Sequence, residues 1–443
     1  MSSRSLNPKT IHREFSGLPG ALGIIFGLPL VVILLHLLTN ENYSIKGINL
    51  DWEAVKKQLP NSKDQLWALC FDAQCWKVYL IWFVSTTFFD LILPGKHKKG
   101  VQLRDGTHLA YNINGKSVSS AFVAVLIARL FSSPTYFVPE LQFVYDHQLQ
   151  LILVTVIFSF LLSVFVYIAS FIPLTFANGV GTKERILSVN GNTGNPIYDF
   201  FIGRELNPRI GSWDIKLFCE LRPGMLLWLA IDLACIHNQY HKYGSVSDSI
   251  VLVTALQAFY VFDGVLNEEG CLSMIDITTD GFGFMLSFGD LAWVPWTYSL
   301  QARYLSNPQN AVHLGYIRIA AIVLLMGVGY YIFSASNNQK SAFKQGKLDH
   351  MKSIKTKTGS KLLCDGWWAM SQHINYLGDW MIAWSWCLTT GFQTPITYFY
   401  VIYFGTLLLH RQMRDDAKCS DKYGEQWEEY KRLVPYKIIP YVY

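Results

Sequence analysis

The stretch between residues 258 and 290 holds most of the side chains that could do acid chemistry, interleaved with aromatic residues. Its polar members are Tyr260, Asp263, Asn267, Glu268, Glu269, Asp276, Asp280 and Asp290. Asp263 and Asn267 are four residues apart, as are Asp276 and Asp280, so each pair can share a helix face. Charged groups at membrane depth are costly and are therefore candidates for function. The stretch predicts a polar pocket that donates a proton. The alternative is an interfacial loop of solvated acids.

Two further polar clusters lie between residue 362 and residue 430. Residues 362–380 follow a basic loop and carry His373, Asn375 and Tyr376 among bulky groups, and residues 411–430 are rich in Arg, Lys, Asp and Tyr. Arg suits two-point contact with a phosphate, and Lys suits a point-charge contact. The second of these clusters therefore predicts a site for a phosphorylated ligand, with a solvated amphipathic helix as the alternative.

Motifs of several other chemistries are missing from the sequence. It has no GxGxxG after a strand, no GxxxxGK[ST], no HExxH and no GxSxG. The eight Cys are scattered without a CxxC pair, so neither a zinc site nor a redox pair is predicted. A nucleotide cofactor, if one binds, is not expected to lie in a Rossmann unit, and no residue is assigned as a metal ligand.

The composition indicates which elements must position these residues. Hydrophobic residues make up 51% of the 443 and charged residues only 16%, whereas a soluble domain has about 25% charged residues. This excludes a disordered chain, a coiled coil and an ordinary cytosolic enzyme. A bilayer core needs ~20 apolar residues per helix. Ten segments approach that length: 21–38, 78–93, 118–137, 151–174, 226–236, 250–265, 282–300, 314–333, 376–390 and 398–409.

The distribution of Lys and Arg sets the expected topology. Basic residues gather before the first segment, after the second, fourth and eighth, and after the last, which places all of them on one side if ten segments span. The positive-inside rule then puts both termini in the cytosol. The loop around Glu268 and Glu269 is an acidic exception on the same side. Residues 101–114 alternate apolar and polar around Asp105-Gly106, which predicts a small cytosolic β-hairpin.

These patterns predict an all-α, polytopic integral membrane protein with about ten transmembrane helices and one small hairpin. Three regions follow from them: 1–220 with the N-terminal helices, 221–335 with central helices and an acidic pocket, and 336–443 with the C-terminal helices and tail. The net charge of +5 is modest, and no block of the chain reads as a nucleic-acid arm.

Three segments resemble the signatures of a known family. GNPIYDFFIGRELNPRIG (194–211), LLCDGWWAMSQHINYLGD (362–379) and the segment 414–443 are similar to those of sterol reductases. That family includes Δ14-, Δ7- and Δ24(28)-sterol reductases and the lamin B receptor. LPGKHKKGVQLRDG and DGVLNEEG look most like the fungal Δ14 members. The resemblance covers nearly the whole chain. It implies a multi-pass protein of the endoplasmic reticulum membrane that reduces the C14=C15 bond of a sterol in ergosterol biosynthesis.

The resemblance also implies a cofactor, partners and site residues. The cofactor is NADPH, and the partners are a sterol substrate, the lipid bilayer and other sterol-pathway enzymes. Tyr260 and Asp415 are implied to be catalytic. The implied cofactor-binding residues are Lys340, Lys344, Leu363, Trp368, Asn375, Tyr376, Asp415, Cys419, Ser420, Asp421, Lys422, Tyr423 and Tyr430.

Physical chemistry agrees with parts of this set. Lys340 and Lys344 lie four apart, where they can share one helix face toward a 2′-phosphate. Trp368 and Tyr376 can cover a ring, and Asn375 can both donate to and accept from a nicotinamide amide. Departures from the family pattern concern fine contacts: position 344 is often Arg, and Asp365, Ala369 and Gln372 replace the more usual Ser, Gly and Arg.

The chemistry of the implied reaction constrains the site further. An isolated alkene must be protonated before it accepts a hydride, here at carbon 15, which leaves a tertiary cation at carbon 14. NADPH then supplies the hydride. The protein must hold an acid on one face and the nicotinamide on the other, and must exclude water. A buried carboxyl is a better donor than a Tyr. The sequence leaves open whether Tyr260 or a carboxyl donates, and Asp263, Glu268, Asp276 and Asp280 could relay protons.

Three other functions remain alternatives at this point. One is reduction of another sterol double bond, Δ7 or Δ24(28). Another is a membrane methyltransferase that uses S-adenosylmethionine, because such enzymes resemble the second signature and the tail. The third is a non-catalytic membrane scaffold.

Overall fold

The computed structural model describes residues 5–173 and 184–443, and the chain forms two compact units. The first unit consists of Met1–Ile45, Asn49–Val246 and Gln257–Asn310. The second consists of Lys46–Ile48, Ser247–Leu256 and Ala311–Tyr443. The division at residues 220 and 335 that the sequence suggests stays a prediction. Each unit is built mainly of helices.

The first half of the first unit holds seven helices and a hairpin among its described residues. They are α1 (Gly17–Leu37), α2 (Trp52–Lys56), α3 (Lys63–Cys70), α4 (Ala73–Ile92), β1 (Lys96–Gln102), β2 (His108–Ile113), α5 (Gly115–Phe131), α6 (Pro139–Asp146) and α7 (Gln148–Ala169). Short polar side chains start several helices: the Asp72 carboxylate accepts the Cys75 N–H and so caps α4.

The rest of the first unit surrounds the buried helix α10. Its elements are α8 (Pro196–Ile202), β3 (Arg209–Ile210), β4 (Trp213–Asp214), α9 (Ile215–Leu221), α10 (Pro223–Tyr243), α11 (Asp248–Leu266, in this unit from Gln257), the 3₁₀ helix η2 (Glu268–Ser273), α12 (Ile275–Thr278), α13 (Phe284–Phe288), the π-helix η3 (Gly289–Trp293), α14 (Val294–Tyr298), α15 (Leu300–Leu305) and the 3₁₀ helix η4 (Pro308–Asn310). Because α10 packs against α6, α9, α14 and α15, it is covered on most sides.

The expected hairpin is present and longer than predicted. Strands β1 and β2 pair antiparallel, with Lys96 opposite Ile113 and Gln102 opposite His108, and the register shifts between Lys99 and Gln102. Gly106 takes a φ of +84° in the turn, a conformation that glycine adopts without strain. Alternation alone marked only residues 101–114, because the basic run before them hides the start of β1.

Five described helical segments are long and apolar enough to cross a bilayer: Gly17–Leu37, Lys63–Ile92 (which comprises α3 and α4), Gln148–Ala169, Asp248–Leu266 and Gly315–Lys344. The other five expected segments are also largely helical, and the count of ten spans stays a prediction. Segment 282–300 is divided among α13, η3 and α14, a π-helical interruption that hydropathy cannot reveal. Residue 174, the end of the expected segment 151–174, lies outside the described residues.

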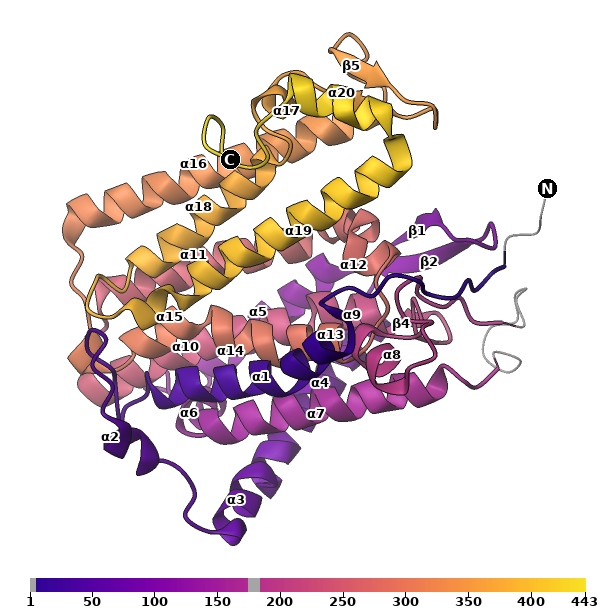
Figure 1. Cartoon of the computed structure of the whole chain (residues 1–443). Coiled ribbons are helices and arrows are strands. Elements are labelled where there is room, and N and C mark those ends of the chain that lie inside the picture. The colour runs from indigo at the N-terminus through magenta and orange to yellow at the C-terminus, as the bar shows by residue number, and fades with distance from the viewer. Residues whose placement is uncertain (1–4, 174–183) are drawn as a thin grey trace. The chain divides into compact units, whose positions relative to one another are not determined.

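The second unit contains the first part of α11 and the C-terminal elements. These are α16 (Gly315–Lys344), β5 (Ser353–Lys355), β6 (Lys361–Leu363), α17 (Trp367–Met370), α18 (Ile374–Leu388), the 3₁₀ helix η5 (Pro395–Tyr398), α19 (Phe399–Tyr423) and α20 (Glu425–Leu433). Helix α18 packs against both α16 and α19, and the three lie side by side (Figure 1). The hairpin β5–β6 lies against α20.

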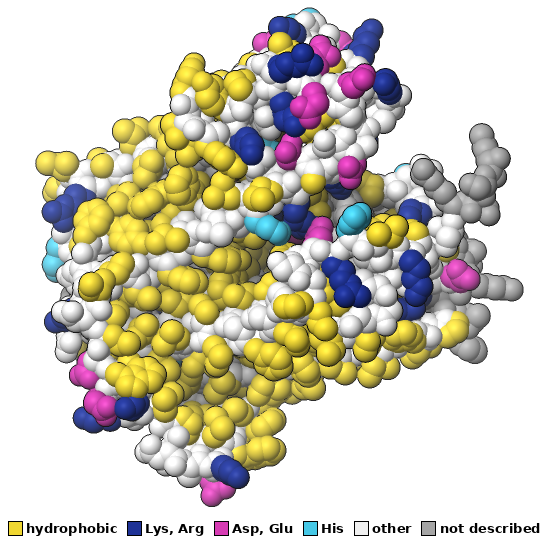
Figure 2. All heavy atoms as spheres, in the orientation of Figure 1, with side chains coloured by type: hydrophobic (Ala, Val, Ile, Leu, Met, Phe, Trp, Pro, Cys, Tyr) yellow, Lys and Arg dark blue, Asp and Glu magenta, His cyan; other side chains and the backbone are white. Residues whose placement is uncertain are grey.

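Side chains on the surface differ between the long helices and the polar end of the second unit. Phe26, Val84 and Leu324 are 67%, 62% and 67% exposed on long helices. Large apolar side chains in that position suit lipid rather than water. Figure 2 shows charged side chains gathered around α20 and β5 and hydrophobic side chains along the helices. The protein is therefore suited to a membrane, with the polar end of the second unit outside the hydrocarbon.

Two glycines let α16 and α18 approach closely. A Cβ built at Gly378 of α18 would lie 2.6 Å from the Gly329 carbonyl oxygen of α16, and one at Gly329 would lie 2.8 Å from the Gly378 oxygen. Small residues permit such backbone contact between membrane helices. The contact fixes how α18 sits on α16.

Gly378→Val is therefore expected to destabilise the second unit by about 1–3 kcal/mol or more, because α16 must move away to admit the side chain. Thermal unfolding in detergent measures the loss. The matched control is Gly327→Val on α16, where a Cβ meets nothing within 4 Å. Equal melting temperatures for the two variants would contradict the close packing.

Candidate functional site

Two unpaired cations lie at the end of α16. Lys340 and Lys344 form no ion pair with a carboxylate among the described residues. The Lys340 Nζ lies 3.8 Å from the centre of the Trp368 ring. The Trp368 Nε1 in turn donates to the Ser336 carbonyl at 2.9 Å, which holds the ring in place. Because no described carboxylate lies within ion-pair distance of either ammonium group, this end of α16 is suited to an anionic ligand.

Helices α18 and α19 bring Tyr376 and Asp415 together. The Tyr376 hydroxyl donates to the Asp415 Oδ2 at 3.2 Å. The imidazole of His373 stacks on the Tyr376 ring, with centroids 4.7 Å apart and planes 17° from parallel. Lys340 also interacts electrostatically with Asp415. The structure thus joins the two polar clusters of residues 362–380 and 411–430 through Tyr376 and Asp415, which are 39 residues apart in the sequence.

Three polar atoms near these residues have no hydrogen-bond partner among the described residues: Asn375 Oδ1, His373 Nε2 and Gln412 Nε2. The Asn375 Nδ2 donates to Asn337 Oδ1 at 3.3 Å, which leaves its oxygen free to accept. Buried polar atoms without partners are costly unless a ligand or water satisfies them. Unpaired cations together with free donors and acceptors fit a phosphorylated, amide-bearing group such as a nicotinamide dinucleotide.

A short segment after α20 holds the residues that lead into α18. The Gln372 N–H donates to the Tyr436 carbonyl at 2.9 Å, and the His373 N–H to the Lys437 carbonyl at 2.8 Å. The Ser371 hydroxyl donates to the Ile438 carbonyl at 2.9 Å. We call residues 434–438 the clasp. It fixes the backbone at His373 and therefore the ring that stacks on Tyr376.

Several expected cofactor residues are buried in hydrophobic clusters. Leu363 and Trp368 pack with Phe343. Tyr430 stacks on Trp427 with centroids 4.9 Å apart, and burial raises the pKa of Tyr430. These side chains shape the surroundings of the polar residues, and a direct contact between Trp368 or Tyr430 and a cofactor ring stays a prediction.

The last turn of α19 carries the remaining expected cofactor residues. Cys419 and Tyr423 are partly buried against the cluster around Tyr430, while Asp421 and Lys422 are exposed. Ser420 is half-buried, and its carbonyl accepts the Gly424 N–H at the end of the helix. These side chains can reach a ligand at the polar end of the second unit, and their role also stays a prediction.

Tyr260, the other expected catalytic residue, belongs to the first unit. It is half-buried on α11, and its ring lies 6.2 Å from that of Trp228 on α10. The Trp228 Nε1 donates to Gln257 Oε1 at 3.2 Å, one turn before Tyr260.

The acids of residues 258–290 lie in different surroundings. Asn267 Nδ2 donates to Asp263 Oδ1 at 2.9 Å, as the spacing predicted, and Glu269 pairs with Lys98 at 2.8 Å on the surface. Glu268 is 1% exposed and forms an ion pair with Arg222. A sterol pocket among these acids stays a prediction.

Lys216 lies buried beside Asp276 and Asp280. Its Nζ donates to the carbonyls of Asp276, Ile277 and Asp280 at 2.8, 2.9 and 2.8 Å. Burial lowers the pKa of Lys216 to about 8, and nearby carboxylates oppose this shift. Lys216 thus satisfies backbone carbonyls in and just after α12. Because all three of its ammonium donors are used, none is left for a ligand.

Sequence reasoning missed Arg222, Asn337 and the clasp. Arg222 stands in RPGM, and its partners Asp90 and Asn114 are 132 and 108 residues away. The available signal was a pair of charged residues at the ends of apolar segments: Arg222 before one segment and Asp90 near the end of another. Nothing in residues 434–438 indicates which backbone groups they bind.

Acid is expected to destabilise the second unit through His373. Burial, with nearby Lys340 and Arg411, lowers the pKa of His373 from 6.5 to about 3. Between those values the unfolded chain binds a proton that the folded chain does not, so stability falls as the pH drops below 6.5. From pH 7.5 to 5.5 the loss is roughly 1 kcal/mol. His373→Gln should flatten the dependence of thermal unfolding on pH, whereas replacing the exposed His350 should not. Equal slopes in all three proteins would refute this origin.

Comparisons with known proteins agree with the motifs. The profile of the ergosterol biosynthesis ERG4/ERG24 family matches residues 9–443. The Delta(14)-sterol reductase ERG24 of Candida albicans is 67% identical over the whole of both chains. The proteins of that name from Saccharomyces cerevisiae and Schizosaccharomyces pombe are 56% identical over 99% of both chains and 42% identical over the whole of both chains. A family match over nearly the full length, with relatives this similar, shows that the chain belongs to the ergosterol biosynthesis ERG4/ERG24 family of sterol reductases.

Proposed function

We propose that the protein is a Δ14-sterol reductase of ergosterol biosynthesis. The observation that carries the proposal is full-length identity of 67% and 56% with two fungal enzymes that bear this name. The apolar surface of the long helices supports a substrate that dissolves in lipid. The protein is accordingly an oxidoreductase that acts on a sterol double bond within a membrane.

The cofactor in this proposal is NADPH. Lys340 and Lys344 supply unpaired positive charge for the 2′-phosphate, and Asn375 supplies a free acceptor for the carboxamide. Asp415 and residues 419–423, which belong to the implied cofactor site, lie in the C-terminal part of α19. A bound NADPH supplies the hydride.

The residues of the chain supply the proton and exclude water. A donor protonates carbon 15 of the sterol, and the positive charge at carbon 14 is removed when the hydride arrives. Tyr260 and Asp415 are both proposed to be needed for the transfer of this one proton. An apolar environment around the alkene prevents water from trapping the cation.

The proposed location is the endoplasmic reticulum membrane, crossed several times, with both termini in the cytosol. The basic segments, which fall on one side if ten segments span, and the exposed apolar helices support it. The bilayer and a sterol are the proposed partners, together with other enzymes of the pathway.

Purified protein in nanodiscs tests the proposal. NADPH oxidation and sterol products are measured with three substrates that carry a Δ14, a Δ7 or a Δ24(28) double bond. Only the Δ14 substrate is expected to be reduced. Reduction of one of the others instead would assign the alternative reductase activity. Transfer of a methyl group from S-adenosylmethionine, without NADPH oxidation, would overturn both.

A further inference from the structure

We propose that Arg222 and Glu268 are positioning residues that hold Tyr260 in place by fixing α11 against α10. This inference rests on the proposed role of Tyr260 as a proton donor. Neither residue is required to touch the sterol or the cofactor.

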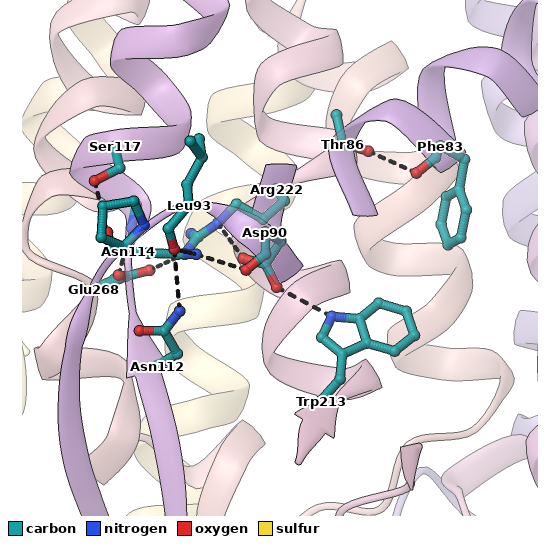
Figure 3. A network of polar contacts seen from close by, with 12 residues as sticks. Phe83, Thr86, Asp90, Leu93, Asn112, Asn114, Ser117, Trp213, Arg222 and Glu268 are labelled. Atoms are coloured by element: carbon teal, nitrogen blue, oxygen red, sulfur yellow. Dashed lines mark hydrogen bonds and ion pairs between the residues drawn. The ribbon is translucent and has the colours of Figure 1, made fainter. Parts of the chain in front are cut away.

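The first contact is a buried charge cluster at the start of α10. The Arg222 side chain is 3% exposed. Its Nε donates to Asp90 Oδ1 at 3.0 Å, and its Nη2 donates to Asn114 Oδ1 at 2.9 Å and also pairs with Glu268 Oε2. The Gly115 N–H donates to Glu268 Oε1 at 2.6 Å. Figure 3 shows Asp90, Asn114 and Glu268 converging on Arg222.

The cluster joins several elements at one point. Asp90 lies in the last turn of α4, Asn114 directly precedes α5 and Gly115 begins it, Arg222 precedes α10, and Glu268 begins η2, two residues after α11 ends. The Trp213 indole N–H donates to Asp90 Oδ2 at 3.0 Å and adds strand β4. A displacement of Glu268 would therefore be opposed by its partners at the start of α5 and of α10, and through Arg222 by Asp90 of α4.

A second contact joins the same two helices further into the unit. Trp228 of α10 donates to the Gln257 oxygen at 3.2 Å, and the Gln257 Nε2 donates to the Tyr298 carbonyl at 2.8 Å. Tyr260 lies in the sequence between Gln257 and Glu268. Because α11 is anchored to α10 on both sides of Tyr260, it can neither slide nor rotate without breaking one of these buried contacts.

The geometry favours positioning over proton relay for Glu268. Both of its carboxylate oxygens already accept hydrogen bonds, one from Gly115 and one from Arg222. A relay would have to break these bonds in each cycle, and breaking one partner from a buried ion pair is strongly unfavourable. A fixed donor matters because catalytic proton transfer needs hydrogen-bond distance to the acceptor carbon, and a misplacement of about 1 Å can cost 10²-fold.

A double-mutant cycle tests the inference. Glu268→Gln keeps the size of the side chain and an acceptor for Gly115 but weakens the pair with Arg222. It is expected to lower kcat about 10- to 100-fold, with the dissociation constant of NADPH, measured by fluorescence titration, unchanged. Arg222→Lys keeps the charge and should lose less. In a Tyr260→Phe background, neither change should lower kcat further, because residues that act through one group are non-additive.

The control is Arg209→Lys, which weakens another buried ion pair of the first unit, that with Asp214 at 2.9 Å. It should lower the melting temperature without the same loss of kcat. Equal fold-losses from Glu268→Gln with and without Tyr260, or an equal loss from Arg209→Lys, would overturn the positioning role. If Arg222→Lys does not fold, the Glu268→Gln cycle still decides. Full activity of Tyr260→Phe would overturn the role of Tyr260, and absent Δ14 reduction by the unchanged protein would overturn the proposed function itself.

Discussion

Asp415→Asn is expected to lower kcat about 10²- to 10⁴-fold, the usual contribution of a general acid. The replacement keeps the shape of the side chain and an oxygen that can accept from the Tyr376 hydroxyl, now 3.2 Å from the Asp415 Oδ2. It removes the group that can release a proton. Steady-state turnover of the Δ14 substrate measures kcat, and fluorescence titration measures NADPH affinity, which should change little.

The neighbouring residue offers a matched control. Asp416 accepts the Trp427 indole N–H at 2.6 Å, and an Asn at position 416 can still accept it. Asp416→Asn should therefore turn over at the normal rate. If Asp415→Asn weakens NADPH binding but leaves kcat at saturation unchanged, Asp415 contacts the cofactor and does not donate the proton.

Lys340→Met is expected to weaken NADPH binding about 10- to 100-fold. A hydrogen bond to a charged group contributes about 1.5–3 kcal/mol, and 1.4 kcal/mol is a factor of ten. The thioether chain still covers the Trp368 ring, from which the Lys340 Nζ is 3.8 Å away, so packing is largely kept. NADH lacks the 2′-phosphate, so its affinity should hardly change. Titration of both dinucleotides gives the two dissociation constants.

Lys347→Met removes an exposed charge just beyond α16 and controls for general electrostatic attraction. It should leave the preference for NADPH over NADH intact. Equal weakening of NADPH and NADH by Lys340→Met would show that Lys340 binds a part of the cofactor other than the 2′-phosphate, contrary to the proposal.

The elements of the fold were accessible from sequence where one local pattern sufficed. The alternation around Asp105-Gly106 located the hairpin, and long apolar runs located α1, α7, α11 and α16. The π-helical break inside 282–300 could not be predicted from the sequence, because a change of backbone hydrogen bonding leaves the hydropathy unchanged. The number of crossings also depends on how shorter segments such as α18 sit in lipid, which composition alone does not determine.

In the candidate site, too, contacts between residues close in the sequence could be predicted, whereas contacts between distant residues could not. The spacing of Asp263 and Asn267 predicted their contact, because both lie on one local face. Periodicity gives a face but not a partner, so the pair of Tyr376 with Asp415 and that of Arg222 with Asp90 required the structure. The contact between Lys340 and the Trp368 ring also required the structure, since a sequence cannot tell a ring that covers a ligand from one that supports a lysine.

The clasp imposes an order on biosynthesis. Residues 371–373 are synthesised roughly sixty residues before residues 434–438, whose carbonyls accept their hydrogen bonds. At about 5–20 residues per second, this separation corresponds to a delay of about 3–12 s. Until then the start of α18 lacks its backbone acceptors. The growing chain therefore cannot complete the arrangement of His373 on Tyr376 by itself, and capacity to retain a dinucleotide is expected to appear only after translation of this last segment.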